Sequence, residues 1–190
     1  MRSSSGYEVK VLVLDFDGVI TSLDLDWGRV KEEVSRAVGF RIVRLRRFWC
    51  EYFGTGLFRR VNELVKRYEV EALGRAEPFP EAASLILGAC GRARIYIATL
   101  QPREPVAEFL ERHGLRRCVA GILTREEFPN KKEMLRWVLE NEGVEPRHVL
   151  FIDDSEDNIE QCRELGINCI HVDRDRAGQN LLEILRVIGI

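Results

Sequence analysis

The sequence lacks the features that mark membrane, secreted and nucleic-acid-binding proteins. No apolar run reaches the roughly 18 residues that a membrane-spanning helix needs, and residues 1–8 hold no apolar signal core. The 29 Lys and Arg nearly balance the 31 Asp and Glu, so the formal net charge of -2 gives no reason to expect nucleic acid or a membrane as the main partner. We therefore expect a cytoplasmic protein whose partner must be inferred from a site.

The cysteines also lack a pairing signal. There are five, which is an odd number, no two are spaced as Cys-x-x-Cys, and two lie in apolar surroundings. This pattern favours buried free thiols in a reducing compartment. The cysteines are Cys50, Cys90, Cys118, Cys162 and Cys169.

An apolar run near the start of the chain ends in two acids. Residues Val9 to Leu14 are followed by Asp15, Asp17 and Gly18. Such a run is typical of a strand buried on both faces, which implies a parallel sheet covered by helices. In open α/β sheets ligands bind beyond the carboxyl ends of the strands, so the two acids stand where a ligand would arrive. An acidic turn is the simpler alternative.

The rest of the chain divides into a helical stretch and a regular alternation. Three apolar stripes at helical spacing fill residues 21–77, and strands and helices then alternate to the end. We predict an α/β protein, a three-layer, Rossmann-like, doubly wound parallel sheet with a helical insertion after the first strand. The core comprises residues 1–20 and 78–190. Its later elements are predicted as strands at 93–98, 119–123, 148–152 and 168–172, and as helices at 81–89, 105–113, 131–142 and from about Gly178.

Polar residues recur where these predicted strands end. Each residue has a simpler interpretation when taken alone. Thr99 and the pair Asp153 and Asp154 could cap helices, and Lys131 and Lys132 could belong to a solvated face. Together, three or four carboxylates at one rim would repel one another unless a hard cation such as Mg²⁺ lay among them. Carboxylates, Mg²⁺, a hydroxyl and an ammonium suit a phosphoryl group. The residues are Asp15, Asp17, Thr99, Lys131 or Lys132, Asp153 and Asp154.

These motifs resemble the haloacid dehalogenase superfamily of hydrolases. The resemblance rests on DFDGVI, on the strand ending IYIAT, on NKKEML, and on FIDDSEDNI with the turn and strand that follow it. It implies that Asp15 is the nucleophile that forms an aspartyl-phosphate and that Asp17 is the general acid and then the base. An aspartate at this second position resembles the phosphatase branch, because the dehalogenases lack it.

The same resemblance implies roles for the later motifs. Thr99 and Lys131 would bind the phosphoryl oxygens. The adjacent Lys132 remains an alternative to Lys131 as the phosphate-binding lysine. Asp154 matches the main metal-binding acid and Asp153 a second ligand, so the implied metal set is these two residues with Asp15 and Asp17. Asn158 stands where a further aspartate is common, and its role stays open.

The helical insertion resembles the cap that many members of this superfamily place over the site. A cap would exclude bulk water and would carry the choice of substrate. Several arginines there could contact anions, but at helical spacing a solvated or acid-paired face is the better interpretation, so we assign none of them to the site. They are Arg41, Arg44, Arg46, Arg47, Arg59 and Arg60.

The sequence therefore predicts a Mg²⁺-dependent phosphatase that hydrolyses a small phosphorylated metabolite through an aspartyl-phosphate. We also expect a raised pKa for Asp17, caused by the neighbouring acids. The alternatives are a phosphomutase or phosphotransferase of the same superfamily, a catalytically silent phospho-ligand-binding protein, and a phospho-acceptor receiver domain, whose motifs would come in another order. The substrate, the oligomeric state and the physiological metal stay open.

Overall fold

The chain is built around a central parallel sheet. The structure is a computed structural model that describes residues 8–173 and residue 181. Five strands pair in the order β3-β2-β1-β4-β5, and every pair is parallel. This arrangement confirms the predicted α/β class. The strands are β1 (Val11–Leu14), β2 (Arg94–Ala98), β3 (Val119–Leu123), β4 (Val149–Asp153) and β5 (Asn168–His171).

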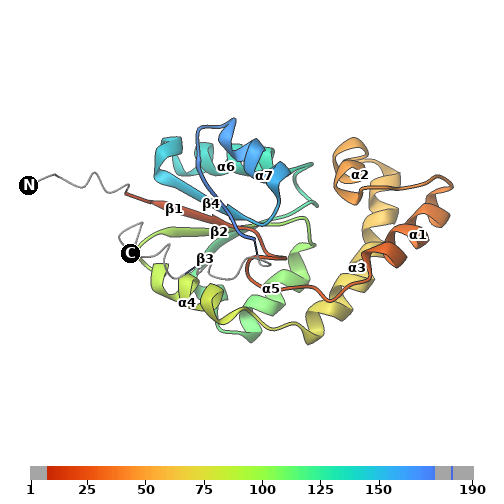
Figure 1. Ribbon diagram of the computed structural model, residues 1–190, viewed down its shortest axis with the longest axis horizontal. Helices are drawn as coiled ribbons and strands as arrows, with labels where there is room; N and C mark the ends of the chain where they lie inside the picture. Colours follow the sequence, from red (N-terminus) through yellow and green to blue (C-terminus); the bar gives the residue numbers. More distant parts are fainter. Residues whose placement is uncertain (1–7, 174–180, 182–190) are drawn as a thin grey trace, which may run out of the picture.

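Helices cover both faces of this sheet (Figure 1). On one face α4 (Pro80–Ala89) and α5 (Arg103–Arg112) pack against the strands, and on the other α6 (Lys131–Glu142) and α7 (Glu156–Arg163) do so. Alternate residues of β1 point into the two apolar layers, so the strand is buried on both sides as its sequence predicted. The three layers leave the strand ends as the place where polar groups can gather.

The register of the strands brings their carboxyl ends level. Leu14, the last residue of β1, lies beside Ile97 of β2 and Ile152 of β4. The next residue in each strand therefore also lies level, which places Asp15 between Ala98 and Asp153. A shared edge is thus fixed by backbone pairing and does not depend on loop conformation.

Between β1 and α4 the chain makes three helices with a hydrophobic cluster of their own. We call residues 27–75 the helical insertion; it comprises α1 (Trp27–Val38), α2 (Leu45–Glu51) and α3 (Gly56–Arg75). Figure 1 shows it beside the sheet, next to the carboxyl end of β1. The two connections to the core lie side by side, because Phe79 N–H donates to Ile20 O at 2.8 Å and the Thr21 hydroxyl donates to Glu77 O at 2.7 Å.

Some helix limits differ from the sequence expectation. The helix predicted at 81–89 begins one residue earlier, at Pro80, and the helix predicted at 105–113 spans Arg103–Arg112. None of the helices in the described ranges is both long and apolar enough to cross a bilayer. The closing helix that was predicted from about Gly178 lies outside the described residues.

The expectation of buried free thiols is wrong, because four of the five cysteines form disulfides and the fifth is exposed. Cys90 is bonded to Cys118 and Cys162 to Cys169, with Cα atoms 5.0 Å and 6.3 Å apart. Both separations fall within the usual range for disulfides, but sequence spacing alone does not reveal them. Cys50 is free and exposed. Both disulfides lie in the core, and the helical insertion contains only the free thiol.

Candidate active site

Three carboxylates meet at the carboxyl edge of the sheet. Asp15 follows β1, Asp153 ends β4 and Asp154 comes next, and one oxygen of each lies within 4.8 Å of the others. Asp15 is 8 % exposed and Asp153 is fully buried, whereas Asp154 is exposed. We call Asp15, Asp153 and Asp154 the acid group.

Lys131 lies against this acid group. Its Nζ is 2.5 Å from Asp15 Oδ1 and 3.2 Å from Asp153 Oδ2, and it also donates to the carbonyl of Ala98. Burial works to lower the pKa of Lys131, but the attraction of Asp15 and Asp153 outweighs it and the pKa is raised. The lysine is therefore held as a buried ammonium between two strands.

The adjacent Lys132 has a different environment. Its Nζ pairs with Glu164 on the surface, and its backbone N–H donates to Gln161. Successive residues of a helix point about 100° apart, since 3.6 residues make one turn, so only one of the two lysines can reach the sheet edge. The structure brings Lys131, and not Lys132, to the acid group.

The acid group carries more negative charge than one lysine balances. Burial raises the pKa of Asp15 well above its usual range, Asp153 adds to this and Lys131 opposes it. Burial, followed by the charge of Asp153, also raises the pKa of Asp154. Three converging carboxylates are the hard oxygen ligands that Mg²⁺ prefers, so the donor set fits a divalent cation.

Gly18 allows one of these acids to approach the loop after β1. A Cβ atom at Gly18 would lie 2.1 Å from Asp154 Oδ2, and the glycine has a φ of +83°. Any side chain at this position would displace the carboxylate, and the left-handed backbone disfavours other residues as well. The glycine of the first motif therefore has a steric role in assembling the acid group.

Asp17 lies outside the acid group and has its own contacts. Its Oδ1 accepts a hydrogen bond from Leu23 N–H at 2.8 Å, in the segment that leads to the helical insertion. Burial is the main cause that raises the pKa of Asp17 to about 6, against the Leu23 hydrogen bond, with smaller contributions from Asp154 and Glu69. The raised pKa agrees with the sequence expectation, although burial outweighs the neighbouring acids as its cause.

Thr99 follows β2 at the same edge and is fully buried. Its N–H donates to Leu123 O at 2.8 Å, and its hydroxyl hydrogen-bonds the side chain of Gln101. Thr99 comes directly after Ala98, whose carbonyl accepts from Lys131. Gln101 was not predicted from the sequence, and it fixes the orientation of the threonine hydroxyl.

Asn158, whose role the sequence left open, supports Asp153. Its Nδ2 lies 3.0 Å from each carboxylate oxygen of Asp153, and Ser155 N–H donates to the same carboxylate at 2.8 Å. The Oδ1 atom of Asn158 is buried and has no hydrogen-bond partner in the described part of the chain. Asn158 therefore orients Asp153 and leaves an acceptor beside the acid group.

Sequence reasoning missed a buried ion pair between the core and the helical insertion. Arg125 and Glu69 are each 1 % exposed, and they form two contacts of 2.6 Å. The guanidinium also donates to Asn62 Oδ1 at 2.7 Å and to the carbonyl of Leu100, and it lies 4.6 Å from the centre of the Trp49 ring. It thus joins α2 and α3 to the loop that follows Thr99.

Two signals in the sequence could have revealed this pair. Arg125 comes two residues after β3, so it stands at the same sheet edge as Thr99 and Asp153. Glu69 lies in phase with the buried positions Val61 and Val65 of α3, where an acid requires a partner. Neither residue belongs to a recognisable motif, so the pair was not predicted from the sequence.

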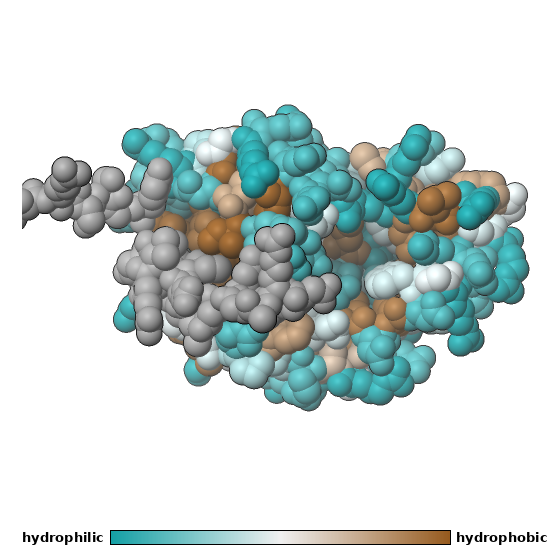
Figure 2. All heavy atoms as spheres, viewed as in Figure 1, coloured by the Kyte–Doolittle hydropathy of each residue, from teal (hydrophilic) through white to brown (hydrophobic). Residues whose placement is uncertain are grey.

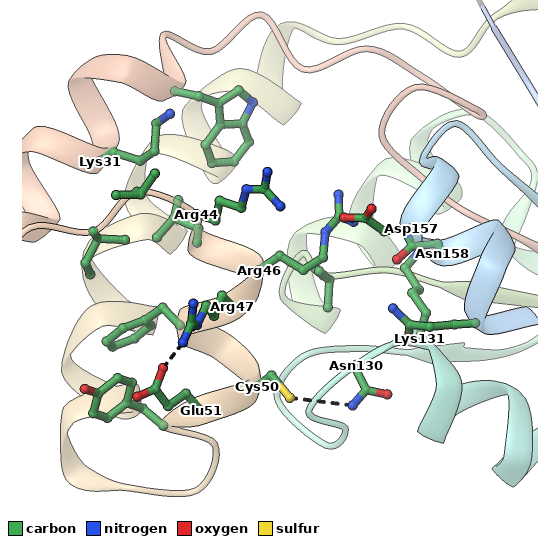
Figure 3. Close-up of a pocket in the computed structure, with 18 of the residues that line it drawn as sticks. Lys31, Arg44, Arg46, Arg47, Cys50, Glu51, Asn130, Lys131, Asp157 and Asn158 are labelled. Atoms are coloured by element: carbon green, nitrogen blue, oxygen red, sulfur yellow. Dashed lines mark hydrogen bonds and ion pairs between the residues drawn. The ribbon is translucent and has the colours of Figure 1, made fainter.

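A large cleft separates the helical insertion from the core. It has a volume of about 1340 Å³, and Lys131 and Asn158 form part of its core side. Figure 2 shows the surface hollowed where the insertion meets the core, and Figure 3 shows the side chains that approach this space from α2 and from α6 and α7. The cleft reaches the acid group through Lys131 and Asn158, which line it and contact Asp15 and Asp153.

Comparisons with known proteins agree with this geometry. The model of the haloacid dehalogenase-like hydrolases matches residues 31–172. The phosphoglycolate phosphatase of Vibrio vulnificus strain YJ016 is 23% identical over 186 residues, covering 84% of this chain and 81% of that protein.

Two solved structures share the fold. The HAD hydrolase YfnB of Bacillus subtilis, described as bound to magnesium, has a TM-score of 0.66 and 15% identity, covering 96% of this chain and 100% of that one. A proposed beta-phosphoglucomutase of Thermotoga maritima has a TM-score of 0.59 and 21% identity, covering 92% and 91%. The family model spans well over half of the sequence, and the chain therefore belongs to the haloacid dehalogenase-like hydrolase family and is an enzyme.

Proposed function

We propose that the protein is a divalent-metal-dependent phosphatase that acts on a small phosphorylated metabolite. The observation that carries the proposal is the buried Asp15 carboxylate held at 2.5 Å from Lys131, beside Asp153 and Asp154 at the open edge of the sheet. A carboxylate nucleophile next to an ammonium and a cation site suits attack on phosphorus, because the incoming phosphoryl group brings negative charge.

Two residues of the first motif divide the reaction between them. Asp15 attacks phosphorus, the bond to the leaving oxygen breaks, and Asp17 gives its proton to that oxygen. Asp17 then takes a proton from water, which attacks the aspartyl-phosphate, releases inorganic phosphate and frees Asp15. A pKa of about 6 lets Asp17 exchange a proton in either direction near neutral pH.

Two further residues bind the oxygens of the phosphoryl group. Lys131 supplies a buried positive charge, and Thr99 supplies a hydroxyl whose orientation is set by Gln101. Lys131 is held by Asp15 and Asp153, so its charge needs little reorganisation. The Thr99 hydroxyl, in contrast, donates to Gln101 and turns its proton to a phosphoryl oxygen when substrate binds. Lys132 has no such role in this proposal, because its ammonium pairs with Glu164.

Asp15, Asp153 and Asp154 would hold the divalent cation. When it is bound, Mg²⁺ supplies positive charge that balances the acid group and the phosphoryl oxygens. The magnesium described for YfnB supports this choice of metal. Asp17 also belongs to the expected metal set, but in this proposal it is assigned to proton transfer because its Oδ1 is engaged by Leu23 N–H.

Phosphoglycolate is the first substrate to test. Five curated relatives carry the name phosphoglycolate phosphatase, and the one from Vibrio vulnificus matches most of the chain. The cleft is considerably larger than this small molecule requires, so other phosphomonoesters should be compared with it.

A phosphomutase is the second candidate, because a neighbour of the same fold is a proposed beta-phosphoglucomutase. Both reactions would begin with the same aspartyl-phosphate. The products distinguish them: a phosphatase releases inorganic phosphate at the rate of substrate loss, whereas a mutase returns an isomer of the sugar phosphate and releases little phosphate.

The direct test is hydrolysis of p-nitrophenyl phosphate in Mg²⁺ by the wild-type protein and by Asp15→Asn. We expect turnover that chelation abolishes and that Asp15→Asn lowers by at least about 1,000-fold, as loss of a nucleophile does in other hydrolases. Asp24→Asn, which alters an exposed acid outside the site, is the matched control and should keep wild-type turnover. Wild-type turnover by Asp15→Asn would overturn the proposal.

A further inference from the structure

The cleft is strongly basic, and five of its basic side chains come from the helical insertion. Seven basic side chains line the cleft against three acidic ones, although the whole chain carries a formal net charge of -2. The basic residues are Lys31, Arg41, Arg44, Arg46, Arg47, Lys131 and Lys132. This excess is therefore local to the cleft and does not reflect the average composition of the surface.

All three acids of the cleft already have cationic partners. Asp157 pairs with Arg46 at 2.9 Å, Glu51 pairs with Arg47, and Glu164 pairs with Lys132. For Arg46 and Arg47 this is the acid-paired alternative of the solvated or acid-paired face that the sequence predicted. Lys131 is likewise engaged, by the acid group.

Three cations remain without an ion-pair partner among the described residues. They are Lys31 of α1 and Arg41 and Arg44 of the connection between α1 and α2. Arg41 and Arg44 are exposed, so they follow the solvated alternative of the sequence expectation and not the acid-paired one. Figure 3 shows Arg44 extending from the insertion toward the open space in front of Arg46, while Arg46 reaches Asp157 at the start of α7.

Positive charges gathered in a concave space attract an anion more strongly than the same charges on a convex surface, because the low-dielectric walls focus their field. A guanidinium suits a carboxylate or a phosphate in particular, since it can donate two parallel hydrogen bonds. The cleft volume of about 1340 Å³ leaves room for a substrate that extends beyond its phosphoryl group.

We propose that Arg44, supported by Arg41 and Lys31, forms a second anion subsite, so that the substrate is a phosphomonoester carrying another negatively charged group. That group is a carboxylate or a second phosphate. The inference rests on the proposed phosphatase function, because it assumes that the phosphoryl group is bound at Asp15. It adds the residues and the charge by which the substrate is selected.

The test compares pairs of ligands that differ only in the second charge. 3-Phosphoglycerate and glycerol 3-phosphate differ in a carboxylate, and fructose 1,6-bisphosphate and fructose 6-phosphate differ in a phosphate. Dissociation constants are measured by calorimetry on the Asp15→Asn protein, which binds without turnover. We expect at least one of the charged ligands to bind about tenfold or more tightly than its partner, as a charge-assisted hydrogen bond would give.

Substitutions in the helical insertion then test whether its arginines cause the preference for the ligand with the second charge. Adding Arg44→Ala should remove most of the tenfold ratio, and adding Arg41→Ala should remove the rest. Arg60→Ala is the matched control, because Arg60 is an exposed arginine of the same insertion that lines a different hollow, and it should keep the ratio. Equal affinities within both ligand pairs, or an unchanged ratio in Arg44→Ala, would overturn the inference.

The two proposals fail in different ways. If p-nitrophenyl phosphate is hydrolysed and neither ligand pair shows a preference, the anion subsite is wrong and the phosphatase function stands. If no phosphomonoester is hydrolysed by the wild-type protein but the preference and its dependence on Arg44 are found, the subsite stands and the phosphatase function is wrong.

Discussion

The two sides of the cleft are built in different ways. On the core side Lys131 is buried against Asp15 and Asp153, whose positions the strand register fixes. On the insertion side Arg41 and Arg44 are exposed and unpaired within the described ranges. The acid group is fixed, whereas the arginines opposite it have no ion-pair partner to hold them. This suits a site in which one side carries out the reaction and the other selects the substrate.

The largest effect expected of a single substitution on stability comes from Arg125, which joins the two sides. Arg125→Leu would leave Glu69 buried without its partner, which costs about 3 to 5 kcal/mol in comparable proteins. The free energy of unfolding, measured in urea, should fall by this amount. The double variant Arg125→Leu/Glu69→Leu should recover much of the loss, because it removes the uncompensated charge.

The control for this experiment is Arg59→Leu. Arg59 is an exposed arginine of α3 whose guanidinium donates to the carbonyl of Gly54 at 3.1 Å, so the change should cost well under about 1 kcal/mol. If Arg125→Leu is no more destabilising than Arg59→Leu, the buried pair does not hold the insertion to the core.

The next effect separates the neighbouring lysines. Lys131→Met should lower kcat/KM for an aryl phosphate by about 100-fold to 1,000-fold, because it removes a fixed positive charge next to Asp15. Lys132→Met is the matched control and should change kcat/KM by less than about twofold, since a surface ion pair contributes little. Equal losses in the two variants would contradict the assignment of Lys131.

A separate test asks whether the core owes its rigidity partly to the disulfides. Loop closure predicts that the Cys90–Cys118 bond, which spans 28 residues, contributes about 3 to 4 kcal/mol, and that the Cys162–Cys169 bond, which spans 7, contributes about 2. A reductant should therefore lower the melting temperature of the wild-type protein. Cys50→Ser should show the same response, because Cys50 is free. A melting temperature that does not respond to reductant would contradict this account.

The core side could be predicted because the order of its residues along the chain is enough to place them. Apolar runs identify strands, parallel strands end at one edge, and the residue after each run must lie there, as Asp15, Thr99 and Asp153 do. The helix at 131–142 was also predicted, and Lys131 lies on its buried face with Met134, Leu135 and Val138, which decides between Lys131 and Lys132.

The insertion side could not be predicted in the same way. Whether an arginine on a helix faces solvent, an acid or a ligand depends on which elements pack opposite it, and Arg46 and Arg44 differ only because Asp157 of α7 lies within reach of one of them. The pair of Arg125 and Glu69 and the two disulfides likewise join residues from separate elements, and nothing in their local sequence encodes the partner.

The most direct test of the central claim is to trap the covalent intermediate. The protein is mixed with p-nitrophenyl phosphate and Mg²⁺ and treated with borohydride, which reduces an aspartyl-phosphate to homoserine, and the peptides are then analysed by mass spectrometry. The proposed mechanism predicts homoserine at position 15 and none in the absence of substrate. Homoserine at another aspartate, or none at all while inorganic phosphate is being released, would contradict it.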